Sequence, residues 1–200
     1  MRDGKDSNTL DFYASEAEAY ASRGQEASRA RLQGFMSVLP PGGRVLELGC
    51  GAGQDSEALL AQGFDVMPTD GSPELAAQAE RRLGRPVAVL LFEDLAEHKA
   101  FDGVWANACL LHVPRAALPA MIARVHAALK PGGVFYASFK AGEEDGRDRF
   151  GRYFNYPSPE WLRGAYGTGR WSRLDIDEET GSGYDRKPTE WLHATAFKMP

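Results

Sequence analysis

A carboxylate followed by three glycines at alternate positions is the part of this 200-residue sequence best suited to chemistry. Glu47 leads the run, and the glycines are Gly49, Gly51 and Gly53. Glycines at this spacing let the backbone turn sharply and pass close to a ligand, where a Cβ atom would collide. A short apolar run at residues 44–46 comes just before, and a helical pattern begins just after. This order predicts a loop between a strand end and a helix N-terminus, where nucleotide-like ligands bind in open α/β sheets.

The spacing of the glycines distinguishes this loop from two related phosphate-binding loops. The dinucleotide fingerprint G-x-G-x-x-G would place its third glycine where Gln54 stands. The P-loop ends in G-K-[S/T], and this segment has no such ending. The loop therefore lacks the usual pyrophosphate signature, which disfavours an NAD-dependent oxidoreductase. For the motif taken alone, the alternative is a glycine-rich turn that binds no ligand.

A second carboxylate, Asp70, follows the glycine run by about 20 residues, the distance at which nucleotide-binding α/β folds place an acid that holds both ribose hydroxyls. Its neighbours Gly71 and Ser72 would share the site. Asp-Gly is also ordinary turn chemistry before a helix, so a structural role is the alternative. With the glycine run in position, we favour ribose binding.

Two further segments follow later strand candidates and would reach the same edge of a sheet. After the strand at 87–91, Asp94 and Leu95 would read the adenine amino group and ring nitrogen through a carboxylate and a backbone amide. A solvated acidic loop is the alternative. After the strand at 101–106, Asn107 enters the same edge, and the small side chains of Ala108 and Cys109 would let adenosine approach closely.

The composition is that of a globular protein and excludes several classes. Hydrophobic residues make up 43% and charged residues 26%, as in folded domains, and the net charge of −5 is unlike that of nucleic-acid-binding domains. No apolar run approaches the roughly 20 residues that cross a bilayer, and the polar N-terminus lacks the core of a signal peptide. Cys50 and Cys109 supply neither a disulfide framework nor metal-ligand spacing. We expect reduced thiols, no metal site and a cytoplasmic location.

Strand and helix patterns alternate along the chain. The expected strands are residues 44–48, 64–69, 87–91, 101–106, 134–139, 171–177 and 190–198. The expected helices are residues 10–20, 28–39, 54–62, 73–83 and 114–129, with another helix start at Ser158, while 143–145 and 180–183 are expected to be surface loops. Pro68 should end its strand, because proline cannot donate to a sheet ladder. Strands separated by helices of this length predict βαβ units and a mostly parallel sheet.

Five sequence elements occur in one order: the Glu47 glycine run, Asp70, Asp94, the turn at 107–113, and Leu-Lys-Pro-Gly-Gly at 129–133. In this ordered set the chain resembles small, single-domain class I S-adenosylmethionine (SAM)-dependent methyltransferases, the broad group that includes tellurite-resistance-type and other small-molecule enzymes. The resemblance covers residues 10–139 well and reaches the C-terminus weakly.

The resemblance implies an α/β, Rossmann-like, doubly wound sheet of seven strands, mostly parallel with one antiparallel strand, with helices on both faces and SAM across the carboxyl ends. One domain would span residues 1–200, with a helical cap at 10–39, a SAM-binding core at 40–139 and acceptor-side loops and strands at 140–200. The residues implied to bind the cofactor are Tyr13, Tyr20, Arg23, Glu47, Leu48, Gly49, Cys50, Gly51, Gly53, Asp70, Gly71, Ser72, Asp94, Leu95, Asn107, Ala108 and Cys109.

In similar enzymes the segment that corresponds to the first helices closes over the cofactor. The resemblance gives Arg23 a charge-assisted bond to the methionine carboxylate. It places Tyr13 and Tyr20 over the sulfonium, whose positive charge an aromatic face attracts. The alternative is two core-facing tyrosines and a solvated arginine.

Methyl transfer from a sulfonium is an in-line displacement with a neutral leaving group. Positioning therefore supplies much of the rate, and a general base is optional. His112 is the candidate base, since neutral imidazole suits that task near pH 7, and a structural role is its alternative. Tyr13 and Tyr153 complete the candidate catalytic residues.

Cationic and aromatic residues follow the fifth strand, where acceptor-binding loops would lie: Lys140, Arg149, Tyr153 and Tyr156. They favour a small methyl acceptor with an anionic or ring portion, and an ordinary charged helix face is the alternative. Residues 107–110 lack the Asn/Asp-Pro-Pro-aromatic motif of nucleic-acid amino methylation. We expect no nucleic-acid or membrane partner, and a monomer or homodimer. A module that binds SAM or its demethylated product without turnover is the second hypothesis.

Overall fold

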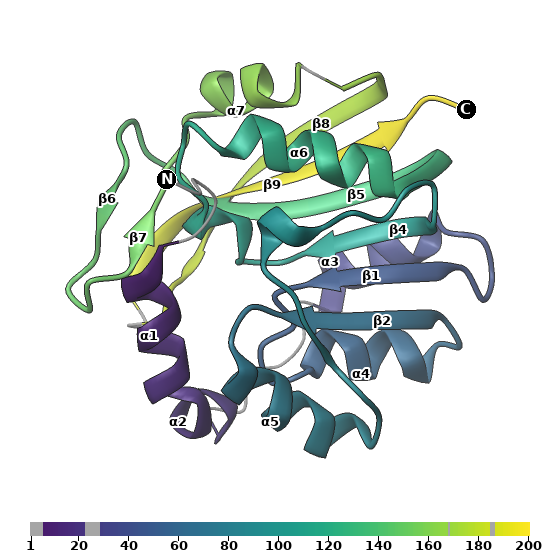
Figure 1. Ribbon diagram of the computed structural model, residues 1–200. Coiled ribbons are helices and arrows are strands. Elements are labelled where there is room, and N and C mark those ends of the chain that lie inside the picture. Colours follow the sequence, from purple (N-terminus) through teal and green to yellow (C-terminus); the bar gives the residue numbers. More distant parts are fainter. Residues whose placement is uncertain (1–5, 23–28, 168, 185–186) are drawn as a thin grey trace.

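The computed structural model describes residues 6–22, 29–167, 169–184 and 187–200, and these build a seven-stranded sheet in the order β3-β2-β1-β4-β5-β9-β8 (Figure 1). The strands are β1 (Arg44–Leu48), β2 (Asp65–Asp70), β3 (Ala88–Val89), β4 (Phe101–Ala106), β5 (Leu129–Lys140), β8 (Trp171–Ser182) and β9 (Pro188–Lys198). β9 runs antiparallel to β5 and β8, and the other pairings in this sheet are parallel. The prediction of a mostly parallel sheet with one reversed strand is confirmed.

Helices cover both faces of the sheet, as predicted (Figure 1). The α-helices are α1 (Ser7–Ser15), α2 (Ala17–Ser22), α3 (Arg29–Ser37), α4 (Gln54–Ala61), α5 (Pro73–Leu83), α6 (Leu118–Ala128) and α7 (Pro159–Tyr166). Val45 packs with Leu32 of α3 and Leu59 of α4, whereas the next residue, Leu46, packs in the cluster that holds Ile122 of α6. Successive strand side chains point to opposite faces, so a strand covered on both sides is continuously apolar.

The first helix pattern is interrupted in the structure, which corrects the prediction of one helix over 10–20. α1 ends at Ser15, where the N–H of Glu16 donates to the carbonyl of Phe12, and α2 begins at Ala17. In a straight helix, Tyr13 and Tyr20 would stand about 10 Å apart along the axis. The break brings their ring centroids to 5.6 Å. The interruption thus forms one aromatic surface from two helices.

The edge of the sheet differs from the prediction at β3 and Pro68. β3 is two residues long, and both are exposed rather than buried, because it pairs only with β2 at the edge. Pro68 lies inside β2 rather than at its end. β3 pairs only with Thr69 and Asp70, so the missing N–H of Pro68 falls beyond the partner strand.

Two helix starts are confirmed and one is corrected. The Oγ atoms of Ser72 and Ser158 accept the N–H groups of Leu75 and Trp161, which caps α5 and α7. The helix expected at 114–129 does not begin at Pro114. Residues 114–117 form a turn, and α6 begins at Leu118 with a proline in its first turn.

The C-terminal part contains more strand than the sequence indicates. Thr180, Gly181 and Ser182 belong to β8 and pair with β9, so the expected surface loop at 180–183 is wrong for these residues. A Cβ atom at Gly181 would lie 3.1 Å from Cδ1 of Trp191, so the glycine gives that ring room. The short strands β6 (Gly146–Arg147) and β7 (Tyr153–Phe154) form a second pair that the sequence did not predict.

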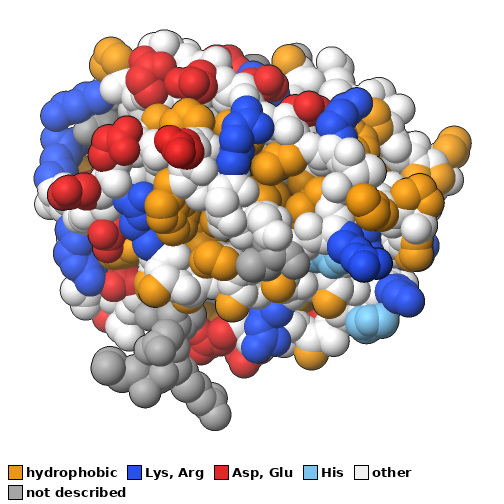
Figure 2. Space-filling model, turned by 90° about the horizontal axis from the view of Figure 1, so that it is seen from above, with side chains coloured by type: hydrophobic (Ala, Val, Ile, Leu, Met, Phe, Trp, Pro, Cys, Tyr) orange, Lys and Arg blue, Asp and Glu red, His pale blue; other side chains and the backbone are white. Residues whose placement is uncertain are grey.

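The surface of the molecule carries side chains of several kinds. Basic, acidic and apolar side chains are interspersed on the face seen in Figure 2. Among the described residues, no helix is both long and apolar enough to span a membrane.

Candidate active site

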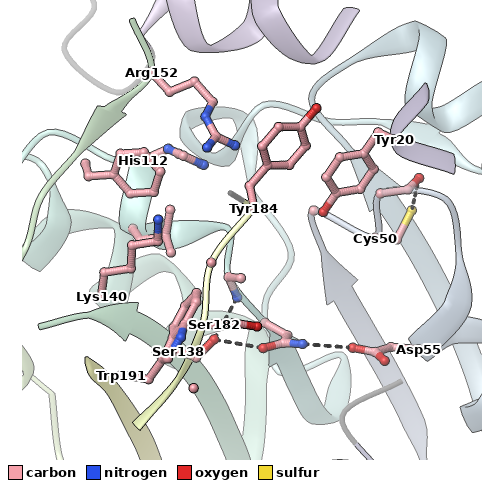
Figure 3. A pocket seen from close by; sticks show the side chains of 18 of the residues that line it. Tyr20, Cys50, Asp55, His112, Ser138, Lys140, Arg152, Ser182, Tyr184 and Trp191 are labelled. Atoms are coloured by element: carbon pink, nitrogen blue, oxygen red, sulfur yellow. Dashed lines mark hydrogen bonds between the residues drawn. The ribbon is translucent and has the colours of Figure 1, made fainter. Parts of the chain in front are cut away.

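Two adjoining cavities open at the carboxyl ends of the central strands, with volumes of about 380 Å³ and 100 Å³. Figure 3 shows the larger cavity. The same residues form the wall between the cavities, since they line both: Tyr13, Tyr20, Gly49, Gly51, Asn107, Ala108 and His112. The structure therefore brings the N-terminal helices, the glycine loop after β1 and the turn after β4 to one place.

The glycine loop is shaped by close approach as well as by backbone conformation. Gly49 has φ +64°, and a Cβ atom there would lie 2.4 Å from the Cβ of Cys109. Gly51 has φ +57°, and its Cβ would lie 3.3 Å from Tyr20. L-residues rarely adopt such φ values, so both positions favour glycine on two counts. Burial raises the pKa of both Cys50 and Cys109, which agrees with packing rather than nucleophilic roles.

Asp70 ties the glycine loop to the start of α5. Its carboxylate accepts the N–H groups of Gly51 and Ser72, each at 2.8 Å. Burial raises the pKa of Asp70 to about 6, against the lowering effect of these backbone donors. The side chain also lines the smaller cavity with Gly71. A carboxylate can accept about four hydrogen bonds, so Asp70 retains acceptor capacity for a ligand.

Two more carboxylates lie at the glycine-loop end of the larger cavity. Glu47 accepts a hydrogen bond from Ser56 in α4, and burial followed by the charge of Asp55 raises its pKa to about 8. Asp55 accepts Nε1 of Trp105 at 2.8 Å and Nδ2 of Asn107 at 3.2 Å. This end of the cavity suits a positively charged group. Glu47 was predicted from the sequence and Asp55 was not, although an acid in the first helical turn after a glycine loop is a usable signal.

Gln54 supplies a donor that the described part of the protein does not use. Its Nε2 atom is buried and has no hydrogen-bond partner there, and its side chain lines the larger cavity. A buried donor without a partner costs about 1–3 kcal/mol, so this atom marks a place for a ligand acceptor. From the sequence, Gln54 served only to exclude a dinucleotide motif, and a ligand-binding role for it was not predicted.

Tyrosine rings form the roof of the cavities. Tyr13 and Tyr20 meet edge to face, and Tyr184 stacks on Tyr20 with centroids 6.2 Å apart. Burial raises the pKa of Tyr13 to about 12 and raises that of Tyr20, so both rings stay neutral at pH 7. Arg23, which was expected to join them, lies outside the described residues.

His112 is held by two hydrogen bonds of opposite direction. Its Nδ1 lies 2.6 Å from the carbonyl of Tyr153 and its Nε2 lies 3.0 Å from the hydroxyl of Tyr13. A carbonyl only accepts, so Nδ1 carries the proton and Nε2 accepts from Tyr13. Burial lowers the pKa of His112 to about 3, which keeps the ring neutral. Nη1 of Arg152 in turn donates to the Tyr13 hydroxyl at 3.1 Å.

Several predicted site residues are not brought to the cavity walls. Those that lie elsewhere are Leu48, Gly53, Ser72, Asp94 and Leu95. Leu48 and Leu95 are buried in the core, Gly53 packs against α5, Ser72 caps that helix, and Asp94 is exposed. The smaller cavity is lined instead by Leu90, Leu91 and Phe92.

The side chain of Tyr153 also lies away from the cavities. Its hydroxyl accepts the N–H of Arg115 at 3.1 Å and donates to Asp145 at 2.9 Å. Its backbone contacts two residues of the cavity walls: the carbonyl lies 2.6 Å from Nδ1 of His112, and the N–H donates to Oγ1 of Thr9 at 2.9 Å. Of the four predicted acceptor-side residues, Lys140 lines the larger cavity and the other three do not.

Three features of this site are typical of class I SAM-dependent methyltransferases. They are the glycine loop after β1 with the acid that precedes it, the acid at the end of β2, and the cavities at the carboxyl ends of a sheet with this strand order. Residues 45–133 match the family model described as a methyltransferase domain. This match places residues 45–133 in the methyltransferase domain family, and the relatives and solved structures below make the chain similar to class I SAM-dependent methyltransferases.

Curated relatives are similar over about half of this chain. Trans-aconitate 2-methyltransferase of Variovorax paradoxus (strain S110) is 38% identical over 121 residues, which cover 57% of this chain and 45% of that protein. Ubiquinone biosynthesis O-methyltransferase of Xanthomonas campestris pv. campestris (strain B100) is 40% identical over 109 residues, covering 50% and 44%. This chain thus spans a little under half the length of these relatives.

Solved structures extend the similarity to nearly the whole chain. Burkholderia thailandensis 1,6-didemethyltoxoflavin-N1-methyltransferase, with bound 1,6-didemethyltoxoflavin and S-adenosylhomocysteine, has a TM-score of 0.74 at 24% identity and covers 97% of this chain and 88% of its own. At that identity the likeness shows the fold alone. The DhpI-SAH complex has a TM-score of 0.67 at 26% identity and covers 97% of both chains.

Proposed function

We propose that this chain transfers the methyl group of SAM to a small-molecule acceptor. The observation that carries the proposal is the common wall of the two cavities. SAM would extend from the smaller cavity into the larger one, where the acceptor would bind. The two molecules would then meet beside Tyr13, Tyr20 and His112. The larger cavity has room for a small molecule next to the donor.

The smaller cavity is the proposed site for the adenosine of SAM. Asp70 would accept hydrogen bonds from the ribose hydroxyls, and the apolar residues 90–92 would face the adenine ring. Asp55 would attract the methionine ammonium group in the larger cavity, and Glu47 would lie beside it as a hydrogen-bond acceptor. Nε2 of Gln54 would donate to the methionine carboxylate. Residues of this chain thus offer charge or a donor for each part of the cofactor.

The protein would contribute positioning rather than a nucleophile–base pair. Bound SAM supplies an activated methyl group on a positively charged sulfonium. Tyr13 and Tyr20 would present neutral ring faces toward that charge. Since Nε2 of His112 already accepts from Tyr13, the histidine would hold the tyrosine in place. Alignment of the acceptor about 3 Å from the methyl carbon would then supply the rate.

We also propose a domain layout, a cellular location and an oligomeric state for the protein. Residues 10–39 would form a cap, 40–139 the cofactor-binding core and 140–200 the acceptor side of one domain. The protein would act in the cytoplasm as a monomer or homodimer, and the net charge of −5 supports a small molecule over a nucleic acid as its partner. The cofactor roles of Arg23, Asp94 and Leu95 and the catalytic role of Tyr153 stay predictions.

Calorimetry with SAM, S-adenosylhomocysteine and NAD, followed by a methyl-transfer assay over small acids, amines, thiols and tellurite, tests the proposal. We expect micromolar binding of the two adenosyl compounds, no binding of NAD and turnover of at least one acceptor. Binding without turnover of any acceptor would favour the sensor hypothesis, and failure to bind SAM would remove both.

A further inference from the structure

The wall of the larger cavity is divided by charge. Glu47 and Asp55 lie at the glycine-loop end, next to β1 and α4. Lys140, at the end of β5, and Arg152, just before β7, lie at the other end. Figure 3 shows Lys140 and Arg152 on the side of the cavity away from Asp55.

Both cations lie against one aromatic ring. Nζ of Lys140 is 4.3 Å and Cζ of Arg152 is 5.2 Å from the ring centroid of Phe154. Their charges also act on His112, since they lower its pKa after the larger effect of burial. The two positive groups therefore surround the same part of the cavity, although they are 12 positions apart in the sequence.

Arg152 is buried, with 3% of its side chain exposed, and Asp148 balances its charge at 2.7 Å. Its Nε and Nη2 atoms donate to Asp148, and its Nη1 atom donates to the hydroxyl of Tyr13. A guanidinium has five N–H groups, so two of them can still donate to a ligand in the cavity that Arg152 lines. A buried arginine of this kind is a strong partner for an oxyanion.

The other acid that lines this end, Glu179, is already engaged. Its carboxylate is 2.8 Å from Nη2 of Arg31 and is 56% exposed. It therefore offers little repulsion to an anion in the cavity, because its charge is paired and screened by solvent. The acid that would repel an anion is Asp55, at the far end, whose negative charge also helps to raise the pKa of Glu47.

A flat apolar surface lies beside Lys140. Trp191 pairs with Lys140 between β5 and β9, and opposed residues of antiparallel strands point to the same face. Both side chains line the larger cavity. Gly181, on the other side of Trp191, leaves its ring room, because a Cβ there would approach to 3.1 Å.

We propose that the methyl acceptor is a small planar carboxylate. Its negative group binds at Lys140 and Arg152, and its planar part packs on Trp191. Repulsion from Asp55 disfavours the reversed orientation, so the charges of the cavity wall select which end of the acceptor faces the methyl donor. This inference rests on the proposed methyl transfer and names the substrate class for that site.

The test compares matched acids and amides on the full chain. The probes are 4-hydroxybenzoate, cinnamate and fumarate, and each is compared with its neutral amide. Binding is measured by calorimetry at a saturating concentration of S-adenosylhomocysteine. Methylation is measured separately with SAM. The variants are Lys140→Gln, Lys140→Arg and, as the matched control, Lys99→Gln, which removes an exposed positive charge next to the opposite end of β4. None of these changes removes a buried side chain, so all are expected to fold.

We expect at least one acid to bind about tenfold or more tightly than its amide, as a charged hydrogen bond predicts. Lys140→Gln should erase that preference, while Lys140→Arg and Lys99→Gln keep it and all variants keep the affinity for S-adenosylhomocysteine. Amides that bind as well as the acids, binding of none of the acids, or an unchanged preference in Lys140→Gln overturns the proposal. A loss of S-adenosylhomocysteine affinity in Lys140→Gln also overturns it, because Lys140 would then serve the cofactor. Failure of the wild-type protein to bind SAM at all is a separate result, which rejects the proposed function itself.

Discussion

The hydroxyl of Tyr13 donates to Nε2 of His112 over 3.0 Å, a bond between residues 99 positions apart. The first helix is thereby fixed to the turn after β4. The bond also occupies the only nitrogen of His112 that could take a proton from an acceptor, since Nδ1 already donates to Tyr153. The neutral ring of His112 thus acts as a support for the tyrosine at the wall between the two cavities.

His112 should make the protein sensitive to acid. Burial lowers its folded-state pKa from 6.5 to about 3, so below 6.5 the unfolded chain binds a proton that the folded chain does not. Stability is therefore complete above that pH and is lost as the pH falls toward 3, by about 1.4 kcal/mol per unit. His112→Gln should flatten this dependence in urea unfolding between about pH 7 and 5. His98→Gln, at an exposed position, is the control, and equal slopes in the wild type and His112→Gln would contradict the assignment.

Glu47 should have the opposite effect on the pH dependence of stability. Burial raises its folded-state pKa from 4.5 to about 8, so the folded chain holds a proton that the unfolded chain releases. The resulting stability is present at acidic pH and is lost as the pH rises through about 8. Glu47→Gln should therefore gain on the order of 3 kcal/mol relative to the wild type between about pH 5 and pH 9. Thermal unfolding at the two pH values measures the difference, and a parallel shift of both proteins would refute it.

Asp70→Ala should weaken SAM binding by about 1–3 kcal/mol, because it removes charged hydrogen bonds to the ribose and releases the N–H of Gly51. Asp65→Ala removes the same charge from the opposite end of β2, where the side chain is 62% exposed, and should leave affinity unchanged. Calorimetry on both variants checks the assignment. Full affinity in Asp70→Ala would mean that the ribose lies elsewhere.

Gly49→Ala should destabilise the protein and abolish cofactor binding. The change forces a Cβ at φ +64° into contact with Cys109 at 2.4 Å. Gly84→Ala has nearly the same φ, +62°, with open space around the new atom, so it measures backbone strain alone, about 1–2 kcal/mol. The clash should cost Gly49→Ala a further 1–3 kcal/mol, roughly. Adding Cys109→Gly should recover that further part, and equal stability of the two single variants would exclude the steric explanation.

The donor half of the site follows from the sequence because its signals are local. Glu47, the glycine loop and Asp70 lie in short segments that can be recognised from the types of adjacent residues. The structure places these segments around the cavities. Ser72 likewise caps α5 where the pattern predicts a helix start. Such features depend on backbone geometry over a few residues, which residue type largely decides.

The acceptor half could not be predicted in the same way. Arg152 enters the cavity because β7 pairs with β6, and Trp191 does so because β9 pairs with β5. Both placements depend on strand pairing between distant segments, which no local pattern records. The buried Nε2 of Gln54 is a similar case, since its missing partner is visible only in the folded chain.

The reversed direction of β9 has a consequence for how this protein can change. β8 ends at Ser182, which pairs with Pro188 of β9, and the next two residues, Gly183 and Tyr184, line the larger cavity together with the glycine loop. Replacing Gly183 or Tyr184 would change the shape of one side of the larger cavity without changing β1 or β2. Changes at the end of β8 could therefore alter which acceptor fits the cavity, while the glycine loop and Asp70 remain unchanged.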